Sequence, residues 1–465
     1  MKIIPLSVIA DTLLARAARP FRCNLSSNQN LKGGKDRQAR PLASLFLSAP
    51  LLCAVVSAYG ESTSADAEIS ELKARIERLE EEKQKAEAGS AAELPEWLKS
   101  IEIHGFLSTA YTWNFNDPAS DTNQLRVFDF RHNSFRVDDF QFSLLRRAKD
   151  PGSVGFRFDL DVGSNIPDVI QSSGLFDDPE GEDIDLRQAF VSYNAPIGNG
   201  LTIDAGKYIT HIGLEVIEGW ENFNDNYSRP FNFGLAIPFT HTGVRVSYPV
   251  TEQLSLMAMV ANGWDQVDDV NDAKAFGGQI GYFPMEGVSL YFNYIGSPEQ
   301  NDDVPGNDED NWRHLFELVW VTKPLAALPD LTFSGGFNYA MEEDVCLGLI
   351  DTDGDGVEDN CQVSLGAVRE DAEWYAVEAI LRYDFTPWFY VALRGEWFRD
   401  DDGVRTGTAQ DLYAVTFTPT FKVTDNVVIR PEIRADFSDE DVFEDDDGAF
   451  KDTQVTGAVN AIFYF

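Results

Sequence analysis

The sequence predicts an all-β fold, a transmembrane antiparallel up-and-down β-barrel of about sixteen strands that follows an N-terminal helix. Three observations predict it. From Ser100 onward, apolar residues fall at alternate positions in many segments, which is the period of a β-strand. Short and long connections between these segments alternate without exception. The last segment ends on an aromatic residue, Phe465, with apolar residues at alternate positions before it.

The last predicted strand, residues 452–465, reads DTQVTGAVNAIFYF. One parity is apolar and comprises Val455, Gly457, Val459, Ala461, Phe463 and Phe465. The other is mostly polar and includes Gln454, Thr456 and Asn460. A terminal strand of this kind resembles the C-terminal signature of bacterial outer-membrane β-barrels, which the barrel assembly machinery reads. Taken alone, the pattern also fits an edge strand of a soluble β-sandwich.

Residues 1–58 are predicted to be a signal segment for export. Residues 41–58 are apolar and end in the small-x-small sequence Val56-Ser57-Ala58, and a basic stretch precedes them. Residues 66–90 are predicted to form a short periplasmic coiled-coil helix, followed by a linker at 91–99. The helix has an a/d seam of apolar residues at spacings of 3, 4 and 3, namely Ile69, Leu72, Ile76 and Leu79. Such a helix could help to hold a homotrimer, and the alternative is a single solvated helix.

The composition excludes several classes of protein. The chain has 465 residues and a formal net charge of -40, which repels nucleic acid. The hydrophobic fraction is 43%, which is too high for a disordered chain. No run of 18 apolar residues follows residue 60, so the sequence predicts no transmembrane helix. A barrel strand needs only about 9–11 residues, of which every second one is apolar.

The barrel is predicted to occupy residues 100–465. Its predicted strands are 101–113, 133–147, 152–163, 183–194, 201–209, 239–249, 252–261, 274–283, 287–296, 311–323, 330–341, 370–385, 387–398, 409–422, 426–437 and 452–465. The long connections are 114–132, 164–182, 210–238, 262–273, 297–310, 342–369, 399–408 and 438–451. Bacterial outer-membrane barrels have short turns at one end and long loops at the other, so the alternation favours a barrel over a sandwich.

Two faces are predicted for each strand. In 426–437, the charged parity comprises Arg430, Glu432, Arg434 and Asp436. The apolar parity comprises Ile429, Ile433, Ala435 and Phe437. A surface in lipid must be apolar while a lumen can be charged and wet, so the charged parity is predicted to face inward.

Several stretches resemble one known family, the OmpL-like β-barrel porins of Gram-negative bacteria. They are IEIHGFLSTAYTWNFN, LRVFDFRHNSF, DAGKYITHIGLEVIEGWENFNDNYSRPFNF and PFTHTGVRVSY, and the resemblance extends from about residue 100 to the end. The resemblance implies a channel in outer-membrane lipid through which small hydrophilic solutes diffuse passively. A closed structural or adhesive barrel with partner-binding loops is the alternative from another class. No G-x-S-x-G, P-loop or H-E-x-x-H string occurs, so no enzyme is expected, although a barrel enzyme could pair Ser and His across strands.

The third long connection, 210–238, is rich in apolar and aromatic residues, including Trp220 and Phe231. In general porins the third loop folds into the barrel and narrows it, and we expect the same here. Its charged candidates for a constriction are Glu215, Glu218, Glu221, Asp225 and Arg229. The opposing wall is predicted by parity to carry Arg157, Arg245, Arg394, Arg430 and Arg434. Opposed charges at a constriction set ion preference, and the surplus of acids predicts a mild preference for cations. The alternative is that the aromatic residues pack a trimer interface or the outer rim.

The sixth long connection contains a second candidate site. Cys346 and Cys361 remain after the signal segment is removed, and they are predicted to form a disulfide in an oxidising compartment. Between them, Asp351, Asp353 and Asp355 precede Gly356 with the spacing of the first half of a calcium loop, and Asp359 could add a ligand. The sequence therefore suggests Ca²⁺ in an extracellular loop, and the alternative is a solvated acidic loop tip.

Overall fold

The computed structural model describes Ala74, Arg75, Arg78 and residues 96–165, 184–269, 271, 273–300, 310–323, 328–347 and 368–465. The chain divides into two units, Ala15–Lys99 and Met1–Leu14 with Ser100–Phe465. In the first unit, the described residues are helical and include α3 (Glu96–Lys99). The predicted signal segment and most of the predicted coiled-coil helix lie outside the described residues. No helix among the described residues is long and apolar enough to cross a membrane.

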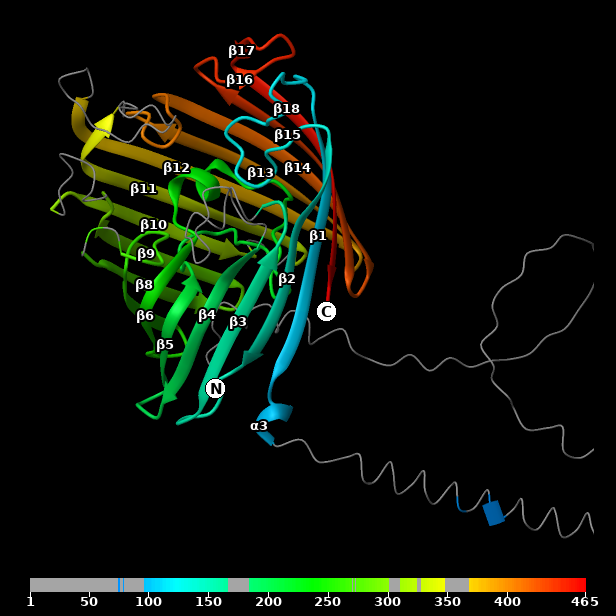
Figure 1. Ribbon diagram of the computed structural model, residues 1–465, viewed down its shortest axis with the longest axis vertical. Helices are drawn as coiled ribbons and strands as arrows, with labels where there is room; N and C mark the ends of the chain where they lie inside the picture. Colours follow the sequence, from blue (N-terminus) through cyan, green and yellow to red (C-terminus); the bar gives the residue numbers. More distant parts are fainter. Residues whose placement is uncertain are drawn as a thin grey trace, which may run out of the picture. The chain divides into compact units, whose positions relative to one another are not determined.

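The second unit is a closed antiparallel barrel, in which every strand pairs with its two neighbours (Figure 1). Its sixteen described strands are β1 (Glu102–Asn114), β2 (Ser134–Arg146), β3 (Val154–Val162), β4 (Ile184–Ala195), β5 (Leu201–Ile209), β6 (Thr240–Pro249), β7 (Leu254–Ala261), β8 (Ala275–Met285), β9 (Val288–Pro298), β10 (Trp312–Thr322), β11 (Leu331–Leu347), β12 (Val368–Thr386), β13 (Phe389–Asp400), β14 (Gln410–Thr424), β15 (Val427–Ser438) and β18 (Thr453–Tyr464). All sixteen predicted strands are thus confirmed.

The last strand closes the barrel. β18 pairs with β15 on one side and with β1 on the other, in a register that runs from Phe106↔Tyr464 to Asn114↔Thr456. Gly105 and Phe465 exchange backbone hydrogen bonds of 3.1 and 3.0 Å just beyond that ladder. Closure leaves no free strand edge, so the edge-strand interpretation of 452–465 is wrong.

Three regions differ from the prediction. β11 continues to Leu347 and β12 begins at Val368, because the two strands go on pairing beyond Glu342, from Val345↔Glu370 to Leu347↔Val368. The last long connection contains a small hairpin, β16 (Phe443–Glu444) and β17 (Phe450–Lys451). Figure 1 shows this hairpin at the upper end of the barrel, and the C-terminus toward the opposite end. The third long connection contains a π-helix, η3 (Asn232–Ala236).

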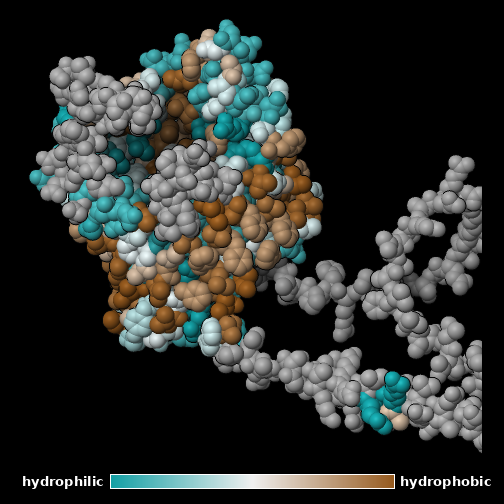
Figure 2. Space-filling view, viewed as in Figure 1, coloured by the Kyte–Doolittle hydropathy of each residue, from teal (hydrophilic) through white to brown (hydrophobic). Residues whose placement is uncertain are grey.

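The two faces of the barrel wall are as predicted. In β15 and β18, Ile433, Val459 and Phe463 point outward and are 50%, 51% and 45% exposed. Arg430, Arg434 and most other members of the opposite parity are buried. Figure 2 shows apolar residues gathered in a broad band over the strands, with hydrophilic residues at the upper end. An apolar outer wall around a charged interior is the distribution that a membrane barrel requires.

Two β-bulges interrupt the alternation on the inner face. In β2, Asp139 pairs with Ser108 and Val137 with Thr109, so Asp138 is an extra residue without a partner in β1. In β4, Arg187 is skipped in the same way between the partners of Asp159 and Leu160. A bulge places two successive side chains on one face. Both members of each pair, Asp138–Asp139 and Arg187–Gln188, are accordingly buried.

Candidate functional site

The third loop, residues 210–239 between β5 and β6, lies inside the barrel. Its helix η3 contacts β11, β12 and β13, and Figure 1 shows it in green within the ring of strands. Seven apolar residues of the loop share one buried cluster with wall residues such as Trp374 and Phe398, whereas Trp220 and Phe223 pack against a second cluster on β1, β15 and β18. Loop members of the first cluster are Ile212, Ile217, Phe231, Phe233, Ala236, Ile237 and Phe239. The aromatic residues that sequence analysis singled out therefore pack in the lumen, where the loop has a small apolar core.

Two buried ion pairs join the third loop to β13 and β15. Glu218 lies 2.7 Å from Arg430 and 3.4 Å from Arg229. Burial raises the pKa of Glu218, but Arg430 and Arg229 outweigh this effect and hold the pKa below its ordinary value. Glu215 lies 2.8 Å from Arg394. There, burial dominates and raises the pKa of Glu215, although Arg394 partly offsets it.

The other two predicted loop acids also meet arginines, in a part of the lumen that is more exposed. Glu221 pairs with Arg157, one of the wall candidates, and with Arg147 at 2.7 Å. Asp225 pairs with Arg382 at 2.9 Å. Arg147 and Arg382 were missed as wall candidates, although Arg382 has the inward parity of β12.

Of the remaining predicted wall residues, Arg434 contacts the third loop and Arg245 does not contact its acids. Arg434 donates a hydrogen bond to the backbone carbonyl of Arg229, and its guanidinium lies 3.4 Å from Glu396. Arg245 contacts none of the loop acids among the described residues. It pairs with Asp204 on β5 at 2.9 Å, because that carboxylate lies directly across the ladder from it. Its prediction as a partner of the loop acids is therefore wrong.

Inward-facing carboxylates on the wall bind the backbone of the loop. Glu432 accepts hydrogen bonds from the N–H groups of Tyr227 and Ser228, at 2.6 and 2.9 Å. Glu396 accepts one from Phe231 at 2.6 Å. Neither Glu432 nor Glu396 was predicted as a site residue, because the acids of the loop pointed to bases on the wall as their partners. Their parity, which they share with Arg430 and Arg394, was the available signal.

Inward-facing donors bind the carbonyl groups of the same loop. Arg394 donates to Ser228 O at 2.7 Å, and Arg430 donates to Asn224 O at 2.7 Å. Trp374 Nε1 donates to Ala236 O at 3.2 Å, at the end of η3. Buried backbone groups outside regular structure need such partners. The wall therefore supplies the hydrogen bonds that an irregular segment in the lumen requires.

The third loop reaches across the barrel from β10 to β1 and β2. Near its start, Gly213 donates its backbone N–H to Glu317 of β10 at 2.9 Å, and β10 lies opposite β2 in the ring. Trp220 stacks on His104 of β1, with ring centroids 3.5 Å apart and an interplanar angle of 6°. Its backbone N–H donates to Gln141 of β2 at 3.3 Å. Arg187 of β4 donates to Glu218 O at 2.8 Å. The third loop thus spans the lumen between β1–β4 and β10–β15.

The first long connection, between β1 and β2, also enters the barrel, which sequence analysis did not predict. Arg126 pairs with Asp436 of β15 at 2.6 Å. Phe128 packs on Phe233 and Phe239 of the third loop, with centroid distances of 5.8 and 6.0 Å. The polar sequence of this connection hid the inward turn.

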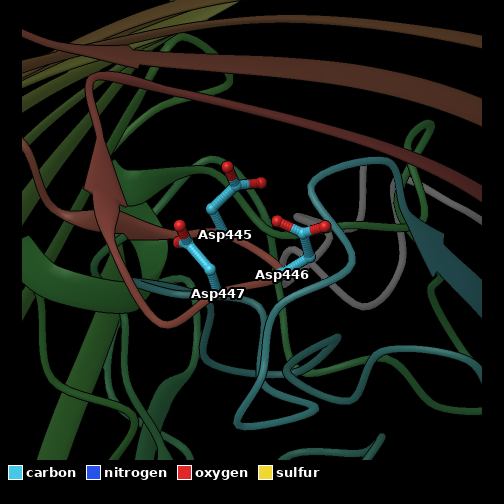
Figure 3. Close-up of side chains that lie close together, drawn as sticks. All are labelled: Asp445, Asp446 and Asp447. Carbon is cyan, nitrogen blue, oxygen red and sulfur yellow. The ribbon is translucent and has the colours of Figure 1, made fainter.

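The second predicted site lies largely outside the described residues. Cys346 is disulfide-bonded, but Cys361 and the acids Asp351, Asp353, Asp355 and Asp359 are not described, so the cystine pairing and the calcium loop stay predictions. Elsewhere in the described part of the chain, the β16–β17 turn brings together the carboxylates of Asp445, Asp446 and Asp447 (Figure 3). Asp445 pairs with Lys451 of the same hairpin, and Asp446 and Asp447 are exposed.

The comparisons with known proteins agree with this architecture. A family model described as "Putative beta-barrel porin-2, OmpL-like" matches residues 100–465. Among solved structures, the high-pH structure of Pseudomonas putida OprB has a TM-score of 0.50 and 12% identity, over 80% of this chain and 96% of that chain. The outer-membrane channel DcaP of Acinetobacter baumannii has a TM-score of 0.49 and 13% identity, over 78% and 97%. An anion-selective porin from Comamonas acidovorans has a TM-score of 0.49 and 9% identity, over 79% and 99%. No curated protein matches the sequence.

Proposed function

The chain belongs to the OmpL-like family of β-barrel porins, and on this premise we propose that its third loop is the constriction of a passive channel for small hydrophilic solutes. One observation supports the proposal above all others. The loop spans the lumen and is bonded on both sides, from Gly213 to Glu317 of β10 and from Trp220 to Gln141 of β2, and these two strands lie opposite each other in the ring. A segment so placed sets the width of any path through the barrel. Family and fold point to the Gram-negative outer membrane as its location.

We also propose a mild preference for cations. Each of the four loop acids is paired with an arginine, so these acids add little net field of their own. The inner wall of β2–β4 has a surplus of acids, and rings of charge of one sign favour ions of the other. The inward-facing acids are Asp138, Asp139, Asp159, Asp161 and Asp185, and the inward-facing bases are Arg136, Arg157 and Arg187, while Arg146 at the end of β2 has the parity of the outer face.

Assembly and loop chemistry remain proposals that rest on the sequence. The a/d seam at 66–90 supports a homotrimer, and the terminal aromatic strand supports recognition by the barrel assembly machinery. The spaced aspartates between Cys346 and Cys361 support Ca²⁺ in an extracellular loop. Catalysis is not part of the proposal.

The dense packing of the third loop favours one rival function, a closed structural barrel. Liposome swelling separates the two functions. Liposomes that contain the folded protein are placed in isotonic solutions of uncharged sugars of increasing size. A porin admits the small sugars, and the swelling rate falls with sugar size. Swelling no faster than that of protein-free liposomes for every sugar, from protein shown to be folded, would favour the closed barrel.

A further inference from the structure

The bulge in β2 places two successive acidic side chains, Asp138 and Asp139, in the lumen. Regular alternation would send either Asp138 or Asp139 into lipid, where a carboxylate is strongly unfavourable. The bulge turns both side chains into the lumen, and they are only 2% and 6% exposed. Two neighbouring carboxylates thus lie side by side in a buried place.

Both carboxylates have an oxygen without a hydrogen-bond donor among the described residues. Asp138 Oδ2 accepts hydrogen bonds of 3.3 Å from Ser108 and from Tyr227 of the third loop. Asp138 Oδ1 and Asp139 Oδ1 are buried and accept none. A buried carboxylate oxygen without a hydrogen-bond donor lowers the stability of the folded state. A further group that contacts these oxygens would therefore stabilise the protein.

The nearest arginines bond elsewhere. Arg136 Nε is 3.8 Å from Asp138, but it donates to Ser164 Oγ at 3.0 Å. The other end of that guanidinium donates to Asn165 Oδ1 at 2.7 Å. Arg187 Nη1 is 3.9 Å from Asp139, but it donates to Glu218 O at 2.8 Å. Neither cation therefore satisfies the two free oxygens.

The two aspartates line a cavity of about 20 Å³, which holds one particle of the size of a water molecule. Oxygen-bearing side chains of Ser108, Asn165, Tyr227 and Glu218 also line it, and Arg229 is the cationic member of the lining. Arg229 lies 3.4 Å from Glu218 and donates to Tyr227 O at 2.7 Å, while its Nε has no hydrogen-bond acceptor among the described residues. Oxygen donors of this kind are the ligands of hard cations.

We propose that this cavity is a binding site for a small monovalent cation such as Na⁺, held by the free oxygens of Asp138 and Asp139. The size of the cavity excludes an organic ammonium group. A divalent ion is disfavoured, because the one group of three carboxylates close enough to share a metal, in the described part of the chain, is Asp445–Asp447. The bound cation would join β2 to the third loop, which contributes the lining residues Ile217, Glu218 and Tyr227.

The test is thermal unfolding of the full-length protein, folded in detergent. Unfolding is followed by circular dichroism in NaCl and in N-methylglucamine chloride of equal ionic strength and pH. A ligand that binds only the folded state raises the unfolding midpoint. We expect a midpoint several degrees higher in NaCl for the natural protein and no difference for Asp139→Asn. The control is Asp159→Asn, which removes an equally buried carboxylate of β3 outside the cavity and should keep the Na⁺ effect.

Two outcomes would overturn the proposal. Equal midpoints of the natural protein in the two salts would mean that water or a proton fills the role of the cation. A Na⁺ effect that persists in Asp139→Asn would place the cation elsewhere. If Asp139→Asn does not fold, the unfolding midpoints of the natural protein in the two salts still show whether Na⁺ stabilises it. The readout is stability, so it is independent of whether the barrel conducts.

Discussion

Arg430 contacts both a side chain and the backbone of the third loop. Its guanidinium binds the carboxylate of Glu218 and the carbonyl group of Asn224, and it also reaches Asn460 of β18. All of these groups are buried. Removing one partner of a buried ion pair lowers the stability of a protein far more than replacing both partners with apolar residues does. The stability of the loop is therefore sensitive to this one side chain.

Arg430→Met is expected to lower the free energy of unfolding by about 3–5 kcal/mol, because Glu218 loses its main cationic partner. The measurement is urea unfolding of the protein folded in liposomes. The matched control is the double variant Arg430→Met/Glu218→Gln, which should regain only part of the loss, because it removes the carboxylate that Arg430 leaves behind but also takes that carboxylate from Arg229. A single variant as stable as the natural protein would show that the pair does not hold the loop.

Asp265 follows β7 and links stability to pH. Its carboxylate accepts hydrogen bonds from the N–H groups of Phe239 and Thr240, where the third loop ends. Burial raises its pKa to about 6, although these hydrogen bonds oppose the shift. In the unfolded chain its pKa is about 4. Between these values the folded state holds a proton that the unfolded state has lost, so stability falls as pH rises.

The stability contributed by Asp265 is therefore expected to be fully present below about pH 4 and lost as pH rises through about 6. Thermal unfolding midpoints between pH 4 and 7 measure this trend. Asp265→Asn should flatten it in that window, and the exposed control Asp425→Asn should leave it intact. If Asp265→Asn leaves the trend as steep as in the natural protein, other groups are responsible.

At the scale of single residues, parity indicated which side chains face the lumen but not which partners they have. Arg394 and Arg430 were assigned to the lumen because they alternate with apolar residues. Arg245 was assigned correctly to the inner face, yet its partner is Asp204 on the adjacent strand. Partners across the lumen depend on the path of an irregular loop, and no sequence period describes that path. The bulge at Asp138 is hidden for the same reason, since alternation assumes an unbroken ladder.

The third loop is held as an element, chiefly through its backbone. Glu396 and Glu432 accept N–H groups on one flank of η3, and Trp374 donates to a carbonyl group at its end. Charge-assisted hydrogen bonds to backbone groups are stronger than neutral ones. The loop is therefore expected to stay in place during conduction.

The double variant Glu396→Gln/Glu432→Gln should loosen the loop, because neutral acceptors bind the backbone N–H groups less strongly. We expect a larger and noisier single-channel conductance and faster proteolysis within the loop. Glu373→Gln is the control, because that carboxylate binds Tyr339 and Tyr375 instead of the loop. Unchanged conductance and proteolysis in the double variant would mean that these glutamates do not fix the loop.

Regular elements were predictable and irregular ones were not. Most of the sixteen strands have the two-residue period, which is weak in 183–194 and 274–283, and turn residues or long acidic connections separate the strands. The helix η3 arises from packing against Trp374 and has no helical period of its own. The hairpin β16–β17 has two residues in each strand, too few to show any period.

At the scale of the whole molecule, the barrel and its third loop act as one structure. The seam between β1 and β18 closes the wall, and the loop that crosses the lumen packs Trp220 on His104 of that same β1. The net charge of -40 does not describe the lumen, where arginines and acids are closely paired. Most acids of β2–β4 also have a basic partner, such as Lys207 of β5 for Asp185, so the proposed ion preference rests on a small surplus and should be mild.

Single-channel recording in a planar bilayer, with a salt gradient across it, tests most directly whether the barrel is a porin narrowed by its third loop. The protein is purified and shown to be folded before it is added. We predict discrete conductance steps and a reversal potential of the sign expected for mild cation preference. An absence of steps from folded protein would contradict the channel, and a reversal potential of the opposite sign would contradict the acidic surplus of the inner wall.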